Sequence, residues 1–182
     1  MQQYDLTTSH LALAHKLWRA HLKAGDAAVD ATCGNGHDTL MLTKLLPDGK
    51  VYAFDIQPQA IENTRERLKD FPNCHFFCQS HAAFPLECAE SNLFVYNLGY
   101  LPKGDMGLTT QTDTTLQSIQ SALTLLAVDG MISITCYPGH EEGAKEEEAI
   151  LLFLRALTGY SIDYYKSNRA LAPSLLIIQK TK

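Results

Sequence analysis

Apolar residues along the chain alternate between the spacing of amphipathic helices and the short continuous runs of buried strands. Helical spacing is predicted for residues 9–22, for a segment through Leu40, Met41 and Leu45, and for residues 58–71, 112–126 and 141–157. Strand-like runs are predicted at residues 27–31, 50–55, 75–78, 93–97 and 131–137. Strands that alternate with helices in this way are typical of a mostly parallel sheet with helices on both faces.

The C-terminal part departs from this alternation. Residues 162–166 and 175–179 are predicted to be two strands joined by a short loop, which favours antiparallel pairing. The predicted fold class is therefore α/β, a doubly wound and mostly parallel sheet with a C-terminal antiparallel hairpin. A chain of 182 residues fits one domain, so we expect residues 1–182 to form it, with the N-terminal helix within residues 1–25 packing against it.

Charge and cysteine content narrow the class of protein. The formal net charge of −5 excludes a uniformly basic nucleic-acid binder, although it leaves room for a local basic patch. Five cysteines, an odd number, and the lack of a secretory segment favour a reducing, cytoplasmic compartment. The longest apolar runs are too short to cross a bilayer, so we expect no membrane contact.

Candidate metal ligands do not form a complete set. Cys78, His81 and Cys88 lack the fourth well-spaced ligand of a zinc site, and the run His140-Glu141-Glu142 lacks a helical His-x-x-x-His partner. The sequence therefore predicts no metal, and the two glutamates are better explained as favourable charge at a helix N-terminus.

A glycine-containing loop follows the first predicted strand. Thr32, Gly34 and Gly36 are small enough to let the backbone approach a ligand closely before it turns into a helix. Asp55 ends the next strand, 19 residues after Gly36, which is where an acidic residue binds ribose hydroxyls. The loop and the carboxylate together predict an adenosine ligand.

Two adenosine ligands compete for this loop. A dinucleotide site needs a third glycine or an alanine where Thr39 stands, and Asp30 at the strand end would repel a pyrophosphate. The same carboxylate suits the cationic methionine part of S-adenosylmethionine, which we therefore favour as the cofactor. In the alternative, Asp30 only caps the turn that the glycines shape.

A second motif follows the fourth predicted strand. Asn97-Leu98-Gly99-Tyr100 resembles the Asn/Asp-Pro-Pro-Tyr motif of amino methyltransferases, with Leu98-Gly99 in place of the prolines. An asparagine oxygen can accept the hydrogens of an amine and aim its lone pair, and an aromatic ring can stack on a base. The alternative makes Asn97 a strand-end cap and Tyr100 a packing residue.

Two histidines are further candidates. His81 follows Ser80 after the third strand, where the adenine or ribose of the donor should lie in this fold. His140 follows the fifth strand and is a candidate substrate-side residue or proton acceptor.

Taken together, these segments carry a resemblance that runs over essentially the whole chain. They are Asp30 to Asp38, Phe54 to Gln57, Ala60 to Thr64, Ser80-His81, Asn97 to Pro102 and Gly139 to Gly143. They resemble the MnmM-type tRNA methyltransferase family, formerly described as ribosomal-RNA methylases. The resemblance implies a class I methyltransferase fold and N-methylation of the 5-aminomethyl group of a modified 2-thiouridine at the wobble position of tRNA, giving 5-methylaminomethyl-2-thiouridine.

The resemblance also assigns residues. The donor-binding set it implies is Asn35, Asp38, Asp55, Gln57, Ser80 and His81. Asn97, Tyr100 and the segment around Tyr137 and His140 would face the nucleoside. The chain departs from the family at Lys103, where a glycine is usual, and in the loop 168–173, which keeps Asn168 and Pro173.

The substrate side includes a group of loop residues. We expect Leu101, Lys103, Asp105, Tyr137, Asn168 and Arg169 to contact substrate, with the anticodon stem-loop of tRNA as partner. Water, His140 and Asp105 are the candidate acceptors of the amine proton. Lys166 is a further candidate phosphate contact near the mouth, whereas Lys16, Arg19 and Lys23 form a helical stripe that is better explained as a solvated face.

Rival readings of the sequence remain open. One is an enzyme of the same fold acting on ribosomal RNA, a protein or a small amine. Another is a non-catalytic module that binds an adenosine ligand or RNA, although such a module has no need of the Asn97 motif. Exposed apolar residues on the first helix are a candidate homodimer contact.

Overall fold

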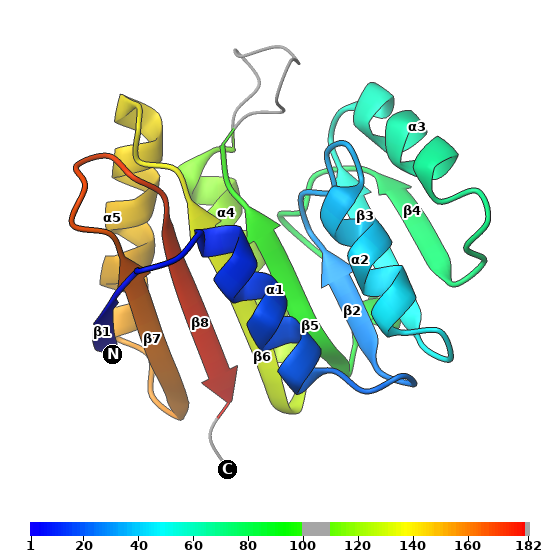
Figure 1. The fold of residues 1–182 in the computed structure, drawn as a ribbon, viewed down its shortest axis with the longest axis horizontal. Helices are drawn as coiled ribbons and strands as arrows, with labels where there is room; N and C mark the ends of the chain where they lie inside the picture. Colours follow the sequence, from blue (N-terminus) through cyan, green and yellow to red (C-terminus); the bar gives the residue numbers. More distant parts are fainter. Residues whose placement is uncertain (100–109, 181–182) are drawn as a thin grey trace.

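The computed structural model describes residues 1–99 and 110–180, and the alternating pattern emerges there as one eight-stranded sheet (Figure 1). The strands are β1 (Gln2–Asp5), β2 (Ala27–Asp30), β3 (Lys50–Asp55), β4 (Cys74–Cys78), β5 (Ser91–Asn97), β6 (Leu126–Cys136), β7 (Tyr160–Lys166) and β8 (Ser174–Lys180). The helices are α1 (His10–His21), α2 (His37–Leu45), α3 (Pro58–Arg67), α4 (Thr112–Leu125) and α5 (Glu141–Arg155), with a 3₁₀ turn, η1 (Leu86–Cys88).

The strand order is β1-β7-β8-β6-β5-β2-β3-β4. Strands β4, β3, β2, β5 and β6 pair in parallel, and β8 pairs antiparallel with both β6 and β7. The expected doubly wound sheet with a C-terminal antiparallel hairpin is confirmed. The order of the strands reverses between β2 and β5, so a ligand site is expected outside the carboxyl ends of these two strands.

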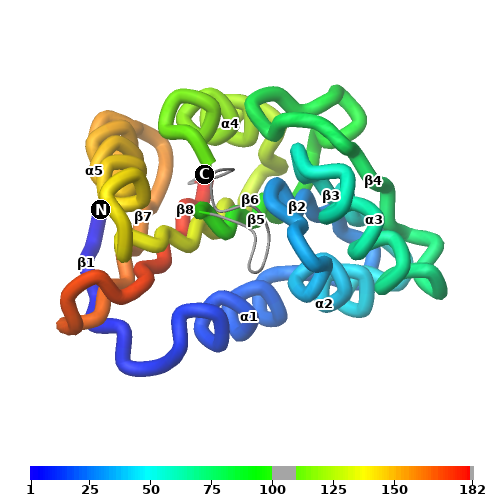
Figure 2. Tube along the Cα trace, turned by 90° about the horizontal axis from the view of Figure 1, so that it is seen from above, coloured from blue at the N-terminus to red at the C-terminus, as the bar shows by residue number. Residues whose placement is uncertain are grey.

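Helices cover both faces of the sheet (Figure 2). Helices α1, α2 and α3 lie on one face and α4 and α5 on the other. The side chains of β5 show why the sheet needs both layers. Phe94 and Tyr96 point into the core under α4 and α5, whereas Leu93 and Val95 point into the core under α1 and α2, and all four are buried. Burial of each large apolar side chain contributes about 1.5–3 kcal/mol to folding.

The N-terminal helix α1 packs on the sheet. Ala14 and Trp18 are buried in the core, and Leu13 and Leu17 pack against it. The exposed large apolar side chains of the described residues all lie outside α1, so this helix offers no large apolar contact, and the homodimer stays a prediction. Leucines at helical spacing bury themselves against the sheet instead.

Two local features differ from the sequence-based description. Residues 2–5 were not predicted to be a strand, yet β1 pairs in parallel with β7 at the sheet edge, and Tyr4 stacks on Tyr165 with 5.0 Å between ring centroids. The turn expected at Asp129-Gly130 is an irregularity inside β6, where Asp129 has φ of +62° and the register with β5 shifts. Because Ser91 pairs with Leu126 and Leu93 pairs with Met131, β6 holds three more residues than β5 over this stretch, and such a bulge bends a strand without ending it.

None of the helices in the described residues is long and apolar enough to span a membrane.

Candidate active site

The loop after β2 is built around two glycines in left-handed conformations. Gly34 has φ of +52° and Gly36 has φ of +75°, values that favour glycine. A Cβ on Gly36 would lie 2.9 Å from Cγ2 and Oγ1 of Thr64 on α3, so the loop also packs too tightly for a side chain there. The hydroxyl of Thr64 donates to the carbonyl of Gly34 at 2.9 Å and holds the loop against α3.

Asp55, at the end of β3, organises this loop from the adjacent strand. Its Oδ2 accepts the N–H of Gly34 at 3.0 Å, and its Oδ1 accepts the N–H of Gln57 at 2.9 Å. Each carboxylate oxygen has a second lone pair, so the group can still accept from a ligand hydroxyl. Burial raises the pKa of Asp55 above its usual value, and the backbone donors oppose that shift.

Asp30 lies behind the loop. Its side chain is fully buried, with Oδ2 accepting the Thr39 hydroxyl at 2.6 Å and Oδ1 accepting the Thr32 N–H at 3.3 Å. Burial, followed by the nearby charge of Asp38, raises the pKa of Asp30 to about 7. The expectation of a direct contact between Asp30 and the donor therefore does not fit this geometry, and the partly exposed carboxylate at this point belongs to Asp38.

Asp38, in the first turn of α2, joins two other elements. Its Oδ2 accepts the Asn97 side-chain N–H at 2.8 Å, and its Oδ1 lies 2.7 Å from Nε2 of His15 on α1. The backbone N–H of Asn97 donates to the hydroxyl of Thr32 at 2.8 Å. The structure thus brings the glycine loop and Asn97 together at the carboxyl ends of β2 and β5.

The remaining donor-side candidates lie around the same edge. The amide of Asn63 donates to Asn35 Oδ1 at 3.2 Å, and Gln57 precedes the first turn of α3. Ser80 is exposed and accepts the N–H of Ala82 at 3.2 Å.

His81 has a buried ring nitrogen without a hydrogen-bond partner among the described residues. This nitrogen is Nδ1, and the ring meets that of Tyr96 edge to face at 6.0 Å between centroids. Burial lowers the pKa of His81 to about 4, so the ring is neutral at pH 7. A neutral imidazole nitrogen without a partner is a ready hydrogen-bonding group for a ligand.

The substrate-side candidates among the described residues come from two loops. Tyr137 follows β6, and its hydroxyl lies 3.2 Å from Nε2 of His10 on α1. Burial raises the pKa of Tyr137 to about 12. Asn168 and Arg169 are exposed in the loop from β7 to β8, which reaches the same edge because Ser174 pairs with Cys136 at the end of β6.

His140 caps α5. Its Nδ1 accepts the N–H of Gly143 at 3.1 Å, so this nitrogen has a structural role. Glu141 and Glu142 both pair with Lys145, at 2.8 Å and 3.1 Å. Among the described residues, no group of three or more His, Cys, Asp and Glu side chains is arranged to hold a metal ion.

Four of the candidate residues, Tyr100, Leu101, Lys103 and Asp105, lie outside the described residues. Hydrogen bonds of Thr110 connect the residues that flank this segment to each other and to α5. Thr110 N–H donates to the carbonyl of Gly99 at 3.0 Å, and its hydroxyl accepts the Gly99 N–H at 2.9 Å and donates to Glu146 at 2.8 Å.

Sequence reasoning missed the contribution of α1. His15 falls in the stripe of Leu11, Ala14 and Trp18, so a titratable side chain on the buried face of the helix was the signal that could have found it. Thr39 and Thr64, both buried, were also missed as supports of the loop.

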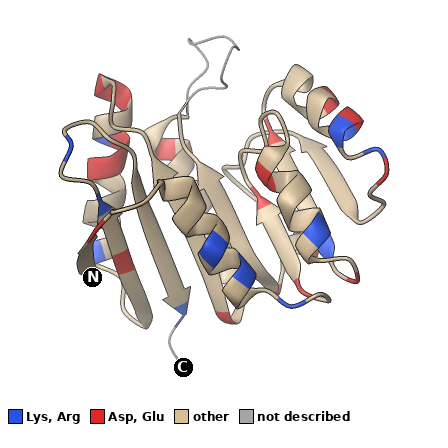
Figure 3. Cartoon of the chain, viewed as in Figure 1, with Lys and Arg blue, Asp and Glu red and all other residues tan. Residues whose placement is uncertain are grey.

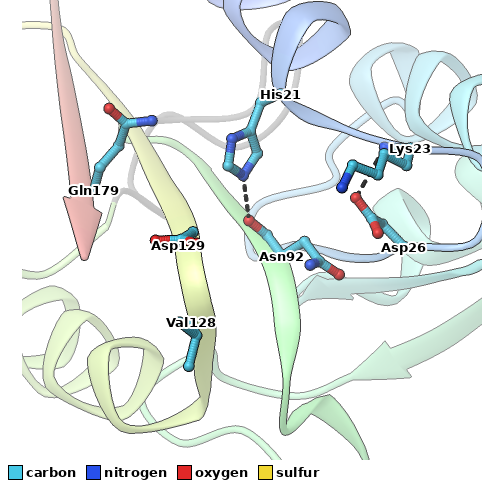
Figure 4. Close-up of a pocket in the computed structure, with 7 residues that line it drawn as sticks. All are labelled: His21, Lys23, Asp26, Asn92, Val128, Asp129 and Gln179. Carbon is cyan, nitrogen blue, oxygen red and sulfur yellow. Dashed lines mark hydrogen bonds between the residues drawn. The ribbon is translucent and has the colours of Figure 1, made fainter. Parts of the chain in front are cut away.

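A separate pocket of about 370 Å³ opens at the opposite edge of the sheet (Figure 4). There the ring of His21 donates to the carbonyl of Asn92 at 3.0 Å, and the N–H of Lys23 donates to Asp26 at 2.9 Å. Asn92 is the second residue of β5 and Gln179 lies near the end of β8, so this pocket is at the amino ends of the parallel strands, away from Asp55 and Asn97.

Comparison with known proteins decides the family. A family model described as "Putative rRNA methylase" matches residues 51–180. The chain belongs to this family. The methylase family agrees with the sheet order and with the loops at its carboxyl edge, and it confirms the methyltransferase family and fold that the sequence predicted.

Individual relatives extend the match over nearly the whole chain. The chloroplastic tRNA (mnm(5)s(2)U34)-methyltransferase of Arabidopsis thaliana is 35% identical over 189 residues, which cover 92% of this chain and 68% of that protein. A crystal structure from Clostridium thermocellum, described as a "putative rRNA-methylase", matches with a TM-score of 0.90 and 32% identity, over 96% of this chain and 99% of that one. A structure from Streptococcus mutans, described as a "putative methyltransferase" in complex with S-adenosylhomocysteine, matches with a TM-score of 0.85 and 31% identity, with the same coverage.

Proposed function

We propose that this protein is an S-adenosylmethionine-dependent tRNA methyltransferase. In this proposal it methylates the 5-aminomethyl group of a modified 2-thiouridine at the wobble position to give 5-methylaminomethyl-2-thiouridine. The observation that carries the proposal is the side chain of Asn97, held by Asp38 at 2.8 Å beside the glycine loop. The Arabidopsis thaliana relative, whose name describes this reaction on uridine 34 of tRNA, supports the choice of substrate.

The residues of the loop fit S-adenosylmethionine. The Asp55 carboxylate, which holds the loop through Gly34, can also accept ribose hydroxyls, and Gly34 and Gly36 leave backbone without side chains for close approach. The buried Nδ1 of His81 is available for the nucleoside part. Asp38 and Asp55 give the site a negative potential, which favours a ligand with a sulfonium and an ammonium group over one with a pyrophosphate. The Streptococcus mutans relative, solved with S-adenosylhomocysteine, supports the same donor.

The proposed chemistry is direct displacement. When bound, the donor supplies a methyl group on a sulfonium sulfur; the amine nitrogen bonds to this carbon as the carbon–sulfur bond breaks, leaving a neutral thioether. Asn97 Oδ1 accepts a hydrogen of the amine. This hydrogen bond orients the amine so that the lone pair of its nitrogen points at the methyl carbon. The amine must first lose the proton of its ammonium form, for which water, His140 and Asp105 stay the candidates, and the product nitrogen sheds a proton to solvent.

The negative charge of α5 should repel the phosphates of RNA, so we expect RNA to approach the protein away from this helix. Helix α5 is dominated by acidic side chains, whereas the charged residues of α1 are Lys16 and Arg19 (Figure 3). The exposed Arg169 lies beside the site and is our choice for a phosphate contact. Lys166 is less suited, because its ammonium group pairs with Glu147 at 3.1 Å. We propose the anticodon stem-loop as the part of tRNA bound, and a cytoplasmic location stays a prediction.

Nucleoside mass spectrometry of total tRNA from cells that lack the protein tests this function. We expect 5-methylaminomethyl-2-thiouridine to disappear and its 5-aminomethyl precursor to accumulate, with recovery when the parent gene is restored. Unchanged tRNA together with a methyl group missing from ribosomal RNA would overturn the choice of substrate and favour the alternative of a ribosomal-RNA methyltransferase.

A further inference from the structure

Helix α1 delivers two histidines to the carboxyl edge of the sheet. His10, its first residue, contacts the hydroxyl of Tyr137, and His15 contacts Asp38. The His15 ring is only 27% exposed and packs at 5.0 Å from the ring of the buried Trp18. The ring is therefore fixed on the helix face that meets the site.

The contact between Asp38 and Asn97 determines how the asparagine amide is turned. An ionised carboxylate only accepts hydrogen bonds, so the atom of Asn97 that lies 2.8 Å from Asp38 Oδ2 must be the amide nitrogen. The amide oxygen Oδ1 is therefore turned away from Asp38. No described residue donates a hydrogen bond to it, so it is the atom left to accept from a substrate amine.

Asp38 needs a second partner to hold this position. It lies close enough to the buried Asp30 for its charge to raise the pKa of that carboxyl group. Two neighbouring carboxyl groups repel each other when both are ionised. A donor on the far oxygen of Asp38 offsets that repulsion, and Nε2 of His15 supplies it at 2.7 Å.

We propose that His15 is a positioning residue for methyl transfer, acting through Asp38 to aim Asn97 Oδ1 at the amine of the substrate. This inference rests on the proposed function, since it assigns a role within the same reaction. It makes α1 part of the active site, in addition to its packing role. His15 itself touches neither substrate nor donor in this account.

Replacement of His15 by Phe keeps a ring against Trp18 and removes the hydrogen bond to Asp38. We expect the rate constant for methylation of tRNA in a single turnover to fall about tenfold, the lower end of losses seen when an orienting partner is removed. Affinity for S-adenosylhomocysteine, measured by calorimetry, should change by no more than about twofold. His15→Gln, which can still donate to Asp38, should recover most of the rate; His15→Ala replaces His15→Phe if the latter does not fold.

A double-mutant cycle separates this role from general support of the fold. In an Asn97→Ala background, His15→Phe should have no further effect on the rate, because the residue it acts on is gone. The matched control is His21→Ala, which removes the hydrogen bond to Asn92 at the other end of the same helix and should leave the rate at that of the parent.

Two outcomes overturn the inference: a His15→Phe enzyme with the parent rate, or losses from His15→Phe and Asn97→Ala that simply add in the double variant. Failure of the proposed function looks different. In that case the parent enzyme itself does not methylate tRNA that carries the 5-aminomethyl group, whatever residue stands at position 15.

Discussion

The side-chain amide of Asn97 donates to the carboxylate of Asp38 across 2.8 Å, and this contact joins the two sequence motifs of the site. It links the end of β5 to the first turn of α2, which are 59 residues apart in the chain. Because one partner donates and the other only accepts, the pair is directional.

That direction predicts the outcome of a charge swap. Asn97→Asp places two carboxylates in contact and should lower the free energy of unfolding by about 1–3 kcal/mol. Adding Asp38→Asn restores a donor and an acceptor in the reverse order, so the double variant should regain part of that loss. Thermal and urea melts of the three proteins measure this, and a double variant less stable than Asn97→Asp would contradict the geometry.

Asp55 is predicted to carry much of the affinity for the methyl donor. Asp55→Ala removes a charged acceptor of the ribose hydroxyls and also frees the N–H of Gly34. A hydrogen bond to a charged group contributes about 1.5–3 kcal/mol, so affinity should fall roughly tenfold to over a hundredfold.

Calorimetry with S-adenosylhomocysteine on folded variants measures that loss. Asp48→Ala is the matched control, since Asp48 is an exposed carboxylate just before the other end of β3. Parent-like affinity in Asp55→Ala, or tight binding of NADH by the parent with no response to the methyl donor, would count against the cofactor.

The buried carboxyl group of Asp30 should make the free energy of unfolding depend on pH. Its pKa is about 7 in the folded protein against 3.8 ordinarily, so folding favours the protonated form. The stability that this contributes is fully present below about pH 4 and is lost as the pH rises through about 7. Asp30→Asn lacks this titration, so its melting temperature relative to the parent should rise from about pH 4 to about pH 8.

Thermal melts of the parent and of Asp30→Asn over that pH range measure this dependence. Asp113→Asn is the control, because Asp113 is an exposed carboxylate. A constant difference between Asp30→Asn and the parent across the range would show that Asp30 stays charged in the fold.

Arg169 is predicted to contact a phosphate of the RNA. Arg169→Ala should weaken tRNA binding several-fold and reduce the slope of log affinity against log salt by about 1, with donor affinity unchanged. Arg155→Ala is the matched control, because Arg155 is an exposed arginine at the end of α5, by the opposite edge of the sheet. Equal salt slopes for Arg169→Ala and the parent would place the RNA on another surface.

Much of the fold could be predicted because its signal is local. A few consecutive residues are enough to predict a buried strand such as Leu93 to Tyr96 or a turn such as Pro47-Asp48-Gly49. Strand β1 could not be predicted in this way. Its residues show no apolar alternation, and its pairing depends on β7, more than 150 residues later.

The site was predictable to the extent that its residues follow strand ends. Asp55 and Asn97 stand at the carboxyl ends of β3 and β5, so the fold itself places them at one edge. The burial of Asp30 and the contact of His15 with Asp38 depend on how α1 and α2 pack together, and no spacing in the sequence specifies that.

Single-turnover methylation with the donor's methyl group isotopically labelled tests the central claim most directly. The purified protein is mixed with tRNA that carries 5-aminomethyl-2-thiouridine, and the nucleosides are analysed by mass spectrometry. We predict label in 5-methylaminomethyl-2-thiouridine, none in tRNA that lacks the aminomethyl group, and a rate about 10²-fold lower for Asn97→Ala at similar donor affinity. No label in that nucleoside, or an Asn97→Ala enzyme with the parent rate, would contradict the account.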